Sequence, residues 1–244
     1  MGNKNFDVLI VGGGLSGLLL GYFLKKHRPD LTFKILEKRE NYAHDRHWAF
    51  WLNKKEKFEF SDLLEKTYST WQVNDKNISA DVYDYAVINS GEFYAYMAQT
   101  LKDHLAFSAD PQDICKDKVV LKSGETLRAE KVFSSVPEKQ QKISPIKARG
   151  LWQNFYGWHV KTENPVFTPE KAVIMDFFRC QPSDAFGFNY VLPFSQHEAL
   201  IEPTVFSSVE KQAKAYFEDA RDDYLNNIGS GNVNILHQES ASLP

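Results

Sequence analysis

The stretch Asp7-Val-Leu-Ile-Val-Gly-Gly-Gly-Leu-Ser-Gly17 decides the fold of this chain. Its apolar half, Asp7–Val11, has the length and composition of a buried parallel strand. A helix is predicted over Leu15–Lys26, where apolar residues recur at helical spacing until Pro29 ends the pattern. A second strand is predicted over Leu31–Leu36. Strand, helix and strand within about thirty residues form one βαβ unit.

The turn between the first strand and the helix carries the glycine pattern of a dinucleotide site. The first glycine permits a tight turn, the second lets the backbone approach a diphosphate, and the third lets helix and strand pack closely. The diphosphate would lie against free N–H groups and the positive end of the helix dipole. The predicted cofactor contacts here are Gly12, Gly13, Gly14, Leu15, Ser16 and Gly17.

Glu37 stands 20 residues after Gly17, at the end of the second predicted strand. An acid at this place can accept hydrogen bonds from a ribose hydroxyl and would repel a 2′-phosphate. Glu37 is therefore a further predicted cofactor contact. The pattern does not by itself separate FAD from NAD.

The amino-acid composition limits the classes of protein and the cellular compartments that remain possible. The net charge of the 244 residues is −3, which offers no basic field for nucleic acid, and no metal site is predicted. The two cysteines, Cys115 and Cys180, are too few for a disulfide framework and indicate free thiols in a reducing compartment. No apolar run reaches the roughly 18 residues of a membrane span, and no secretory signal is present. A cytoplasmic protein is expected, with attachment to a membrane surface left open.

Short β-type runs and two more helices follow Glu37. Residues 137–149 are polar and form the best candidate for a linker. This mixture predicts an α/β nucleotide-binding domain that carries an antiparallel sheet. The predicted helices are Gly91–Leu105 and Val209–Leu225, and the predicted strands are Tyr68–Val73, Val82–Ile88, a hairpin over Val119–Leu127, Lys131–Ser135, Phe155–Val160, Ala172–Phe177, Phe188–Val191 and Ala199–Ile201.

Several segments in order along residues 7–204 resemble the lycopene cyclase family of FAD-dependent carotenoid enzymes. After the glycine loop, these segments are Asp45-Arg-His-Trp-Ala-Phe-Trp51, Gln153-Asn-Phe-Tyr-Gly-Trp-His-Val160, Met175-Asp-Phe177, Tyr190-Val-Leu-Pro-Phe194 and Leu200-Ile-Glu-Pro-Thr204. The resemblance implies a Rossmann-like FAD-binding domain and a second antiparallel β-sheet substrate domain. We assign residues 1–60 and 91–145 to the first, and residues 61–90 and 146–244 to the second.

The resemblance also implies a reaction, in which the ψ ends of lycopene or a similar linear carotene close to β-ionone rings. There is no net redox change, but reduced FAD is required, with NAD(P)H as the electron source. The enzyme must supply an acid, stabilise a carbocation and exclude water. An anionic reduced flavin near the cation suits the second task. Because the substrate lives in the bilayer, a working enzyme would be peripheral on the membrane.

Glu202 is the predicted acid, because the resemblance assigns an essential glutamate to this position. It also lies in an apolar strand, where burial would keep it protonated. Pro203 stands where many relatives have a second acid. Asp176, an acid within another apolar strand, is the second catalytic candidate, although a solvent-facing position fits equally well. Arg46 is expected near the cofactor edge, and His47, which departs from the family's usual threonine, is given no role.

The aromatic side chains of the second half allow two interpretations. Trp152, Phe155 and Trp158 could line a tunnel for a polyene or pack in an ordinary core.

The final stretch, Glu239-Ser-Ala-Ser-Leu-Pro244, resembles a family segment that leads to a further flavin-contacting loop, with Ala241 in place of a glycine. We therefore expect a C-terminally truncated cyclase that binds FAD weakly or not at all. Two alternatives stay open: another FAD-dependent enzyme of the same fold, such as a prenyl reductase or a hydroxylase, and an inactive truncated remnant.

Overall fold

The computed structural model describes residues 4–43, 46–135, 150–178 and 185–243. The predicted linker at 137–149 and Cys180 lie outside them. The chain forms two compact units, Met1–His44 with Ser90–Lys147 and Asp45–Asn89 with Ala148–Pro244. Residues 45–60, which we assigned to the nucleotide-binding domain, thus belong to the second unit. The reason is that β3 (His47–Asn53), a strand not predicted from sequence, pairs along its whole length with β7 (Tyr83–Asn89).

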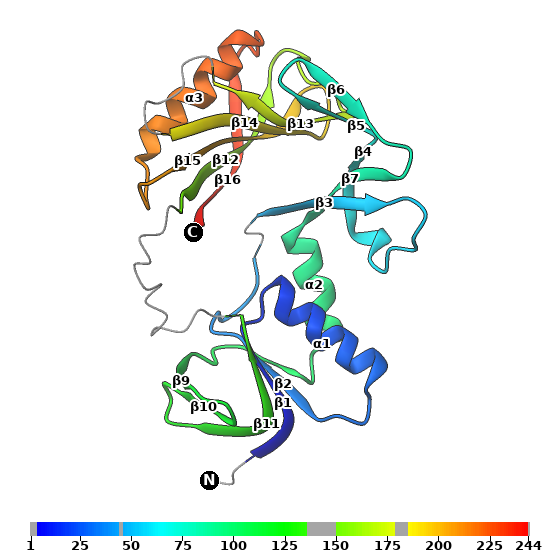
Figure 1. Cartoon of the computed structure of the whole chain (residues 1–244), viewed down its shortest axis with the longest axis vertical. Coiled ribbons are helices and arrows are strands. Elements are labelled where there is room, and N and C mark those ends of the chain that lie inside the picture. Colours follow the sequence, from blue (N-terminus) through cyan, green and yellow to red (C-terminus); the bar gives the residue numbers. More distant parts are fainter. Residues whose placement is uncertain (1–3, 44–45, 136–149, 179–184, 244) are drawn as a thin grey trace. The chain divides into compact units, whose positions relative to one another are not determined.

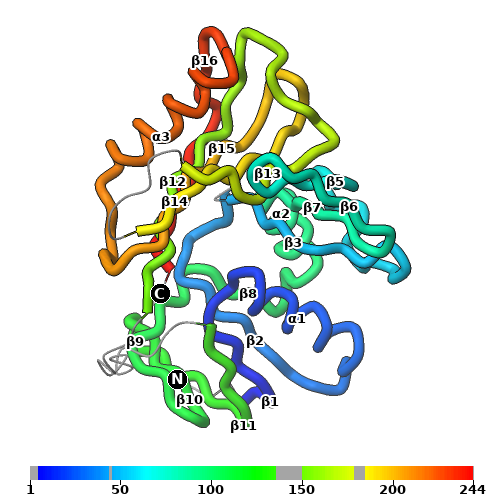
Figure 2. The backbone as a smooth tube through the Cα atoms, turned by 45° about the horizontal axis from the view of Figure 1, so that its top comes forward, coloured from blue at the N-terminus to red at the C-terminus, as the bar shows by residue number. Residues whose placement is uncertain are grey.

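The first unit is built on a six-stranded sheet in the order β8-β2-β1-β11-β10-β9. Its β1 lies between β2 and β11 and runs parallel to both (Figures 1 and 2). This confirms the predicted βαβ unit and the α/β fold class. The elements of this unit are β1 (Lys4–Val11), α1 (Leu15–His27), β2 (Phe33–Leu36), α2 (Ser90–Thr100), β8 (Leu105–Ala106), β9 (Pro111–Ile114), β10 (Lys118–Leu121) and β11 (Thr126–Ser134).

The hairpin predicted over Val119–Leu127 is formed by β10 and β11, which pair antiparallel. Its turn includes Gly124, whose φ of +87° lies in the left-handed region that glycine tolerates. Strand β11 continues to Ser134, so the run Lys131–Ser135 belongs to the same strand and is not a separate one. Cys115, just before this hairpin, carries a free thiol.

The second unit contains a small sheet, in the order β3-β7-β4, and a seven-stranded sheet, in the order β16-β12-β15-β14-β13-β5-β6. The large sheet is antiparallel except where β13 runs parallel to β5. This confirms the predicted antiparallel sheet domain. Its further elements are η1 (Ser61–Leu63), β4 (Leu64–Tyr68), β5 (Thr70–Val73), β6 (Lys76–Ser79), β12 (Trp152–Thr162), β13 (Lys171–Phe177), β14 (Ala185–Pro193), β15 (Glu198–Ser207), α3 (Lys214–Asn227) and β16 (Val233–Leu243).

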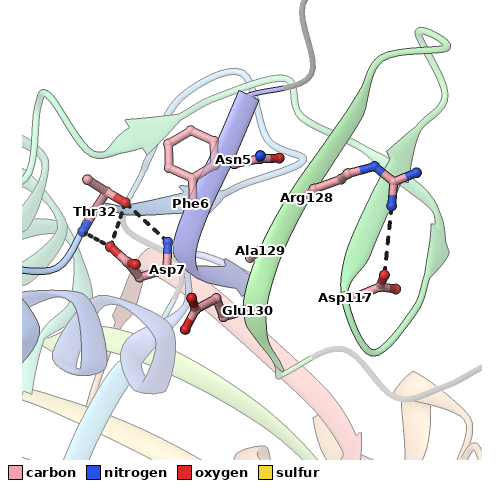
Figure 3. A pocket seen from close by; sticks show the side chains of 8 residues that line it. All are labelled: Asn5, Phe6, Asp7, Thr32, Asp117, Arg128, Ala129 and Glu130. Carbon is pink, nitrogen blue, oxygen red and sulfur yellow. Dashed lines mark hydrogen bonds and ion pairs between the residues drawn. The ribbon is translucent and has the colours of Figure 1, made fainter.

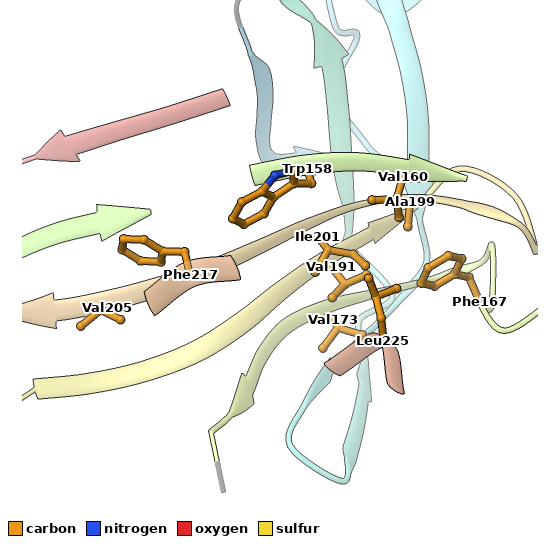
Figure 4. Packing of buried hydrophobic residues seen from close by; sticks show 10 residues of the cluster. All are labelled: Trp158, Val160, Phe167, Val173, Val191, Ala199, Ile201, Val205, Phe217 and Leu225. Atoms are coloured by element: carbon orange, nitrogen blue, oxygen red, sulfur yellow. The ribbon is translucent and has the colours of Figure 1, made fainter. Parts of the chain in front are cut away.

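Side chains alternate between the two faces of the large sheet. One face, called here the α3 face, packs against α3 through a core that Figure 4 shows. The opposite face, called the Glu202 face, meets the small sheet through a second cluster that includes Tyr68, Leu192 and Leu200. The core of the α3 face consists of Trp158, Val160, Phe167, Val173, Val191, Ala199, Ile201, Val205, Phe217 and Leu225.

Trp158 belongs to the core of the α3 face and not to a tunnel beside Glu202. Its side chain is 0% exposed, and the Arg221 guanidinium of α3 lies 4.4 Å from the ring centroid. Trp152, six residues earlier on β12, shares this face by alternation. Of the three aromatic residues considered for a polyene tunnel, only Phe155 lies on the Glu202 face, opposite Thr204.

Candidate functional site

The glycine loop of the first unit has the geometry that a diphosphate needs. Gly12 has φ +101°, in the left-handed region, and makes the tight turn after β1. A Cβ at Gly17 would overlap the carbonyl oxygen of Gly12, so only glycine permits this close packing. A Cβ at Gly14 would meet no atom within 4 Å, so the space in front of this backbone is open. The first turn of α1 contains no acidic residue, and the N–H groups of Leu15, Ser16 and Gly17 come too early in the helix to have an acceptor within it. The loop therefore fits an anionic phosphate group.

Glu37 lies at the end of β2, where it was predicted, but its carboxylate is engaged within the protein. Its Oε2 accepts hydrogen bonds from the Gly13 N–H and from the Arg39 guanidinium, both at 3.0 Å, and Oε1 accepts one from the Arg39 N–H at 2.8 Å. Burial raises the pKa of Glu37, but the bonds from Arg39 and Gly13 outweigh it and hold the pKa below its ordinary value. The group is thus a carboxylate at neutral pH that also fixes the loop.

Sequence reasoning missed the side chains that accompany Glu37. The Tyr42 hydroxyl donates to the Gly13 carbonyl at 2.7 Å, and the Tyr42 ring stacks on Tyr94 with centroids 4.3 Å apart. The Arg39 guanidinium lies 4.8 Å and 5.0 Å from the centroids of these two rings. Arg39 follows Glu37 by two residues and could have been found from that spacing, whereas Tyr94 comes from α2 and is brought near only by the fold.

A hollow of about 360 Å³ lies beside the first half of β1, far along the strand from the glycine loop (Figure 3). Asn5, Phe6 and Asp7 of β1 line it together with Thr32. There the Asp7 carboxylate accepts hydrogen bonds from the Thr32 N–H at 2.6 Å and from its hydroxyl at 2.7 Å. Ligands of open α/β sheets bind at the carboxyl ends of the parallel strands, where the glycine loop lies. This hollow is therefore not the nucleotide site.

Glu202 is surrounded by residues from neighbouring strands of the large sheet. It pairs with Tyr190 of β14 on one side. On its other side, across β12, Gly157 pairs with Glu239 of β16. A Cβ at Gly157 would lie 3.3 Å from Oε2 of Glu202 and 2.9 Å from Cγ of Glu239. A row of Tyr190, Glu202, Gly157 and Glu239 thus crosses the Glu202 face, and the missing side chain in the middle leaves the two acids as neighbours.

These surroundings favour the neutral form of Glu202. Burial raises the pKa of Glu202 well above its ordinary value, and the negative charge of Glu239 raises it further. The charge of Arg46 and a bond from Thr204 act in the opposite direction without reversing the shift. The surroundings of the acid predicted from sequence therefore favour its protonated form, which is the form that a proton donor needs.

Two tyrosines adjoin this acid. The hydroxyls of Tyr85, on β7, and Tyr190, on β14, lie 2.8 Å apart. Burial raises the pKa of both, so both stay neutral at neutral pH. They form a hydrogen-bonded polar pair packed against a largely apolar core cluster that includes Leu192 and Leu200.

Raising the pH is expected to destabilise the wild-type chain relative to Glu202→Gln. The folded state keeps a proton on Glu202 that the unfolded state releases above the ordinary pKa of 4.5. The stability from this group is therefore fully present below pH 4.5 and is lost as the pH rises towards the folded pKa, by at most about 1.4 kcal/mol per pH unit. Urea unfolding of both proteins at about pH 5 and about pH 8 measures this difference. A difference that does not change with pH would contradict it.

Glu239 is held in place by His47, the residue to which the sequence assigned no role. The His47 N–H and the ring Nδ1 each lie 3.2 Å from Oε2 of Glu239. Both side chains are almost fully buried, with exposed fractions of 1% for His47 and 3% for Glu239. The other ring nitrogen of His47 lies 3.5 Å from the carboxylate of Glu65, whose side chain is 31% exposed. No local pattern reveals this group, because it joins β3 and β16 from opposite ends of the second unit's sequence.

Asp176, the other predicted catalytic acid, is not brought together with Glu202. It pairs with Asn189 on β14 and lies near Tyr224 of α3, which places it on the α3 face. Arg46 belongs to the second unit, where its charge acts on Glu202. Within the described residues, no group of three or more His, Cys, Asp and Glu side chains is arranged to hold a metal ion.

Comparison with known proteins identifies the family. A family model described as lycopene cyclase protein matches residues 7–244. The chain belongs to the lycopene cyclase family. It is 23% identical to a lycopene beta-cyclase from Pseudescherichia vulneris, over 98% of this chain and 61% of that protein. The chain thus spans less than two thirds of the length of this curated relative.

Solved structures show that this lycopene cyclase family member shares its fold with flavoproteins. A geranylgeranyl bacteriochlorophyll reductase-like protein from Thermoplasma acidophilum is similar with a TM-score of 0.71 and 14% identity, over 99% of this chain and 66% of that chain. The rebeccamycin biosynthetic enzyme RebC, solved with reduced flavin, is similar with a TM-score of 0.56 and 13% identity, over 99% of this chain and 53% of that chain. None of the helices in the described part of the chain has the length and apolar character to cross a membrane.

Proposed function

We propose that this protein closes the ψ ends of lycopene, or of a similar linear carotene, into β-ionone rings by acid catalysis. The observation that carries the proposal is Glu202, a buried carboxyl group beside Tyr190 and Glu239 whose surroundings raise its pKa and favour its protonated form. Such a group can donate its proton to a terminal double bond. Phe155 and Tyr190 lie on the same face of the sheet, and aromatic faces favour a developing cation.

We infer that FAD is the cofactor and that residues 12–17 would hold its diphosphate. The open backbone at Gly14 and the free N–H groups of the first helical turn support this. The Glu37 carboxylate can accept about four hydrogen bonds and accepts three within the protein, which leaves one lone pair for a ribose hydroxyl. Arg46 stays a predicted cofactor contact. When bound, reduced FAD, with NAD(P)H as the electron source, would supply negative charge that stabilises a carbocation without net redox chemistry.

The remaining chemistry is that of the chain's own residues. Glu202 donates the proton, the apolar residues Leu192 and Leu200 keep water from the cation, and the pair of tyrosines stays neutral beside them. A catalytic role for Asp176 would require a carotene end on the α3 face, which α3 covers, so we propose Glu202 alone as the acid. Because linear carotenes dissolve in the bilayer, we further propose peripheral docking on the membrane from the cytoplasm.

Product analysis in cells that accumulate lycopene tests this function. New cyclic carotenes are expected, with the hydrogen count of the substrate unchanged. The similarity to a reductase-like protein makes a flavin-dependent reductase the second candidate, and a changed hydrogen count would favour it. Unchanged lycopene would favour the remaining alternative, an inactive protein.

A further inference from the structure

We propose that Glu202 and Glu239 share one proton across Gly157, and that Glu239, anchored by His47, is the positioning residue that keeps Glu202 loaded as a proton donor. This inference deepens the proposed function and rests on it for the role of Glu202. No role for Glu239 or His47 followed from the sequence.

The gap at Gly157 makes the pair possible. Any side chain at this position would begin 2.9 Å from Cγ of Glu239 and 3.3 Å from Oε2 of Glu202, and would separate the two acids. With glycine there, no side chain of β12 stands between the acid on β15 and the acid on β16. Two carboxyl groups placed so close cannot both be ionised without strong repulsion, so one proton stays with the pair.

The contacts of Glu239 decide where the proton is held. The His47 N–H donates to Glu239, and the ring of His47 adds a second polar contact to the same oxygen. The backbone N–H can only donate, so this bond favours the carboxylate form of Glu239, because a hydrogen bond to the charged form stabilises it. The proton is therefore left on Glu202, for which Thr204 and the charge of Arg46 are the stabilising partners found among the described residues.

The pair of acids can regain its proton after each proton transfer to the substrate. When Glu202 gives its proton to a double bond, its O–H bond breaks and a C–H bond forms on the substrate. Two carboxylates then stand side by side, which strongly favours uptake of a proton. The ring cation gives up one proton from carbon as its final double bond forms, and the pair takes one proton back, so charge and atoms balance.

Other titratable groups surround Glu202, Glu239 and His47, some of them through His159 only, and must be followed in any titration. Those near Glu202 come from the residue before β3, from β7 and from β14, and those near His47 and His159 come from β4, β12, β15 and β16. They are Arg46, Glu65, Tyr85, His159, Tyr190, Glu198 and His237.

Carbon-detected NMR of the full chain, labelled with ¹³C at the glutamate carboxyls, tests the proposal. Glu202→Gln and Glu239→Gln assign the two resonances. In the wild type, Glu202 is expected to be protonated at neutral pH, and both resonances should move in both steps of a coupled titration. In Glu239→Gln, the proton dissociation constant of Glu202 should rise about tenfold or more.

Matched variants separate charge from structure. Glu239→Asp keeps the charge and should leave Glu202 protonated at neutral pH. Glu198→Gln removes a carboxylate from the same strand and face, one that pairs with His159, and should also leave Glu202 protonated. The proposal is overturned if Glu202 titrates alike in Glu239→Gln and wild type, or if the wild type shows independent titrations. The second result is measured on the wild type, and the variants serve only to assign its resonances.

The outcome is distinguishable from a failure of the proposed function. A Glu202→Gln protein that still forms rings would remove Glu202 from the chemistry while leaving a coupled titration intact. Independent titrations with activity that still depends on Glu202 would remove the role of Glu239 alone.

Discussion

Glu202→Gln is expected to lower the yield of cyclic carotene by about 100-fold or more, the scale of a lost general acid. The amide has nearly the same shape as the carboxyl group, but it cannot release a proton to carbon. The structure gives no reason for misfolding, because the surroundings of the wild-type side chain already favour its neutral form. Cyclic product per amount of folded protein, in cells that accumulate lycopene, is the measurement.

Glu198→Gln is the matched control for this experiment. Glu198 lies on the same strand and the same face, but its carboxylate bonds to His159 and not to Glu202. It should keep most of the cyclic product. Near-normal ring formation by Glu202→Gln would exclude Glu202 as the acid, whatever the control shows.

Two glycine substitutions should separate folding from cofactor binding in the first unit. In Gly17→Ala, the added methyl overlaps the Gly12 carbonyl, and we expect a loss of about 1–3 kcal/mol in the free energy of unfolding. In Gly14→Ala, the methyl meets no protein atom within 4 Å, and φ is −79°, so stability should change by less than about 0.5 kcal/mol.

The methyl of Gly14→Ala instead fills the space that we assign to the diphosphate. We expect the dissociation constant for added FAD to rise about tenfold or more, which equals about 1.4 kcal/mol of binding energy. Flavin fluorescence titration and urea unfolding of the same preparations measure both quantities. Wild-type FAD affinity in Gly14→Ala would show that the diphosphate does not lie against this backbone.

The first unit was the more predictable from sequence because its signals are local. The glycine turn, the apolar strand before it and the helical spacing after it all lie within residues 7–26. By contrast, β3 was missed because aromatic and apolar residues occupy both of its faces, so no alternation marks it as a strand. Its pairing with β7 holds it in place, and neither segment's sequence predicts that pairing by itself.

In the acid site, too, the positions of single residues depend on strand pairings that the sequence does not predict. The spacing of its strand alone would have placed Glu202 at the surface, and its burial was expected only from the family resemblance, whereas the position of Glu239 depends on the register between β12 and β16. The face of Asp176 depends on an irregularity. Simple alternation from Val173, on the α3 face, would place Asp176 on the opposite face, but a register shift between these residues reverses it.

The parallel pairing of β13 with β5 bears on how the protein folds during synthesis. These strands are about one hundred residues apart, and the polypeptide completes most of the nucleotide-binding unit between them. The segment that carries β3 to β7 must therefore wait, with aromatic surface uncovered, until β12 to β15 have left the ribosome. Distant pairings of this kind slow folding, so the emerging chain is expected to depend on chaperones more than its size suggests.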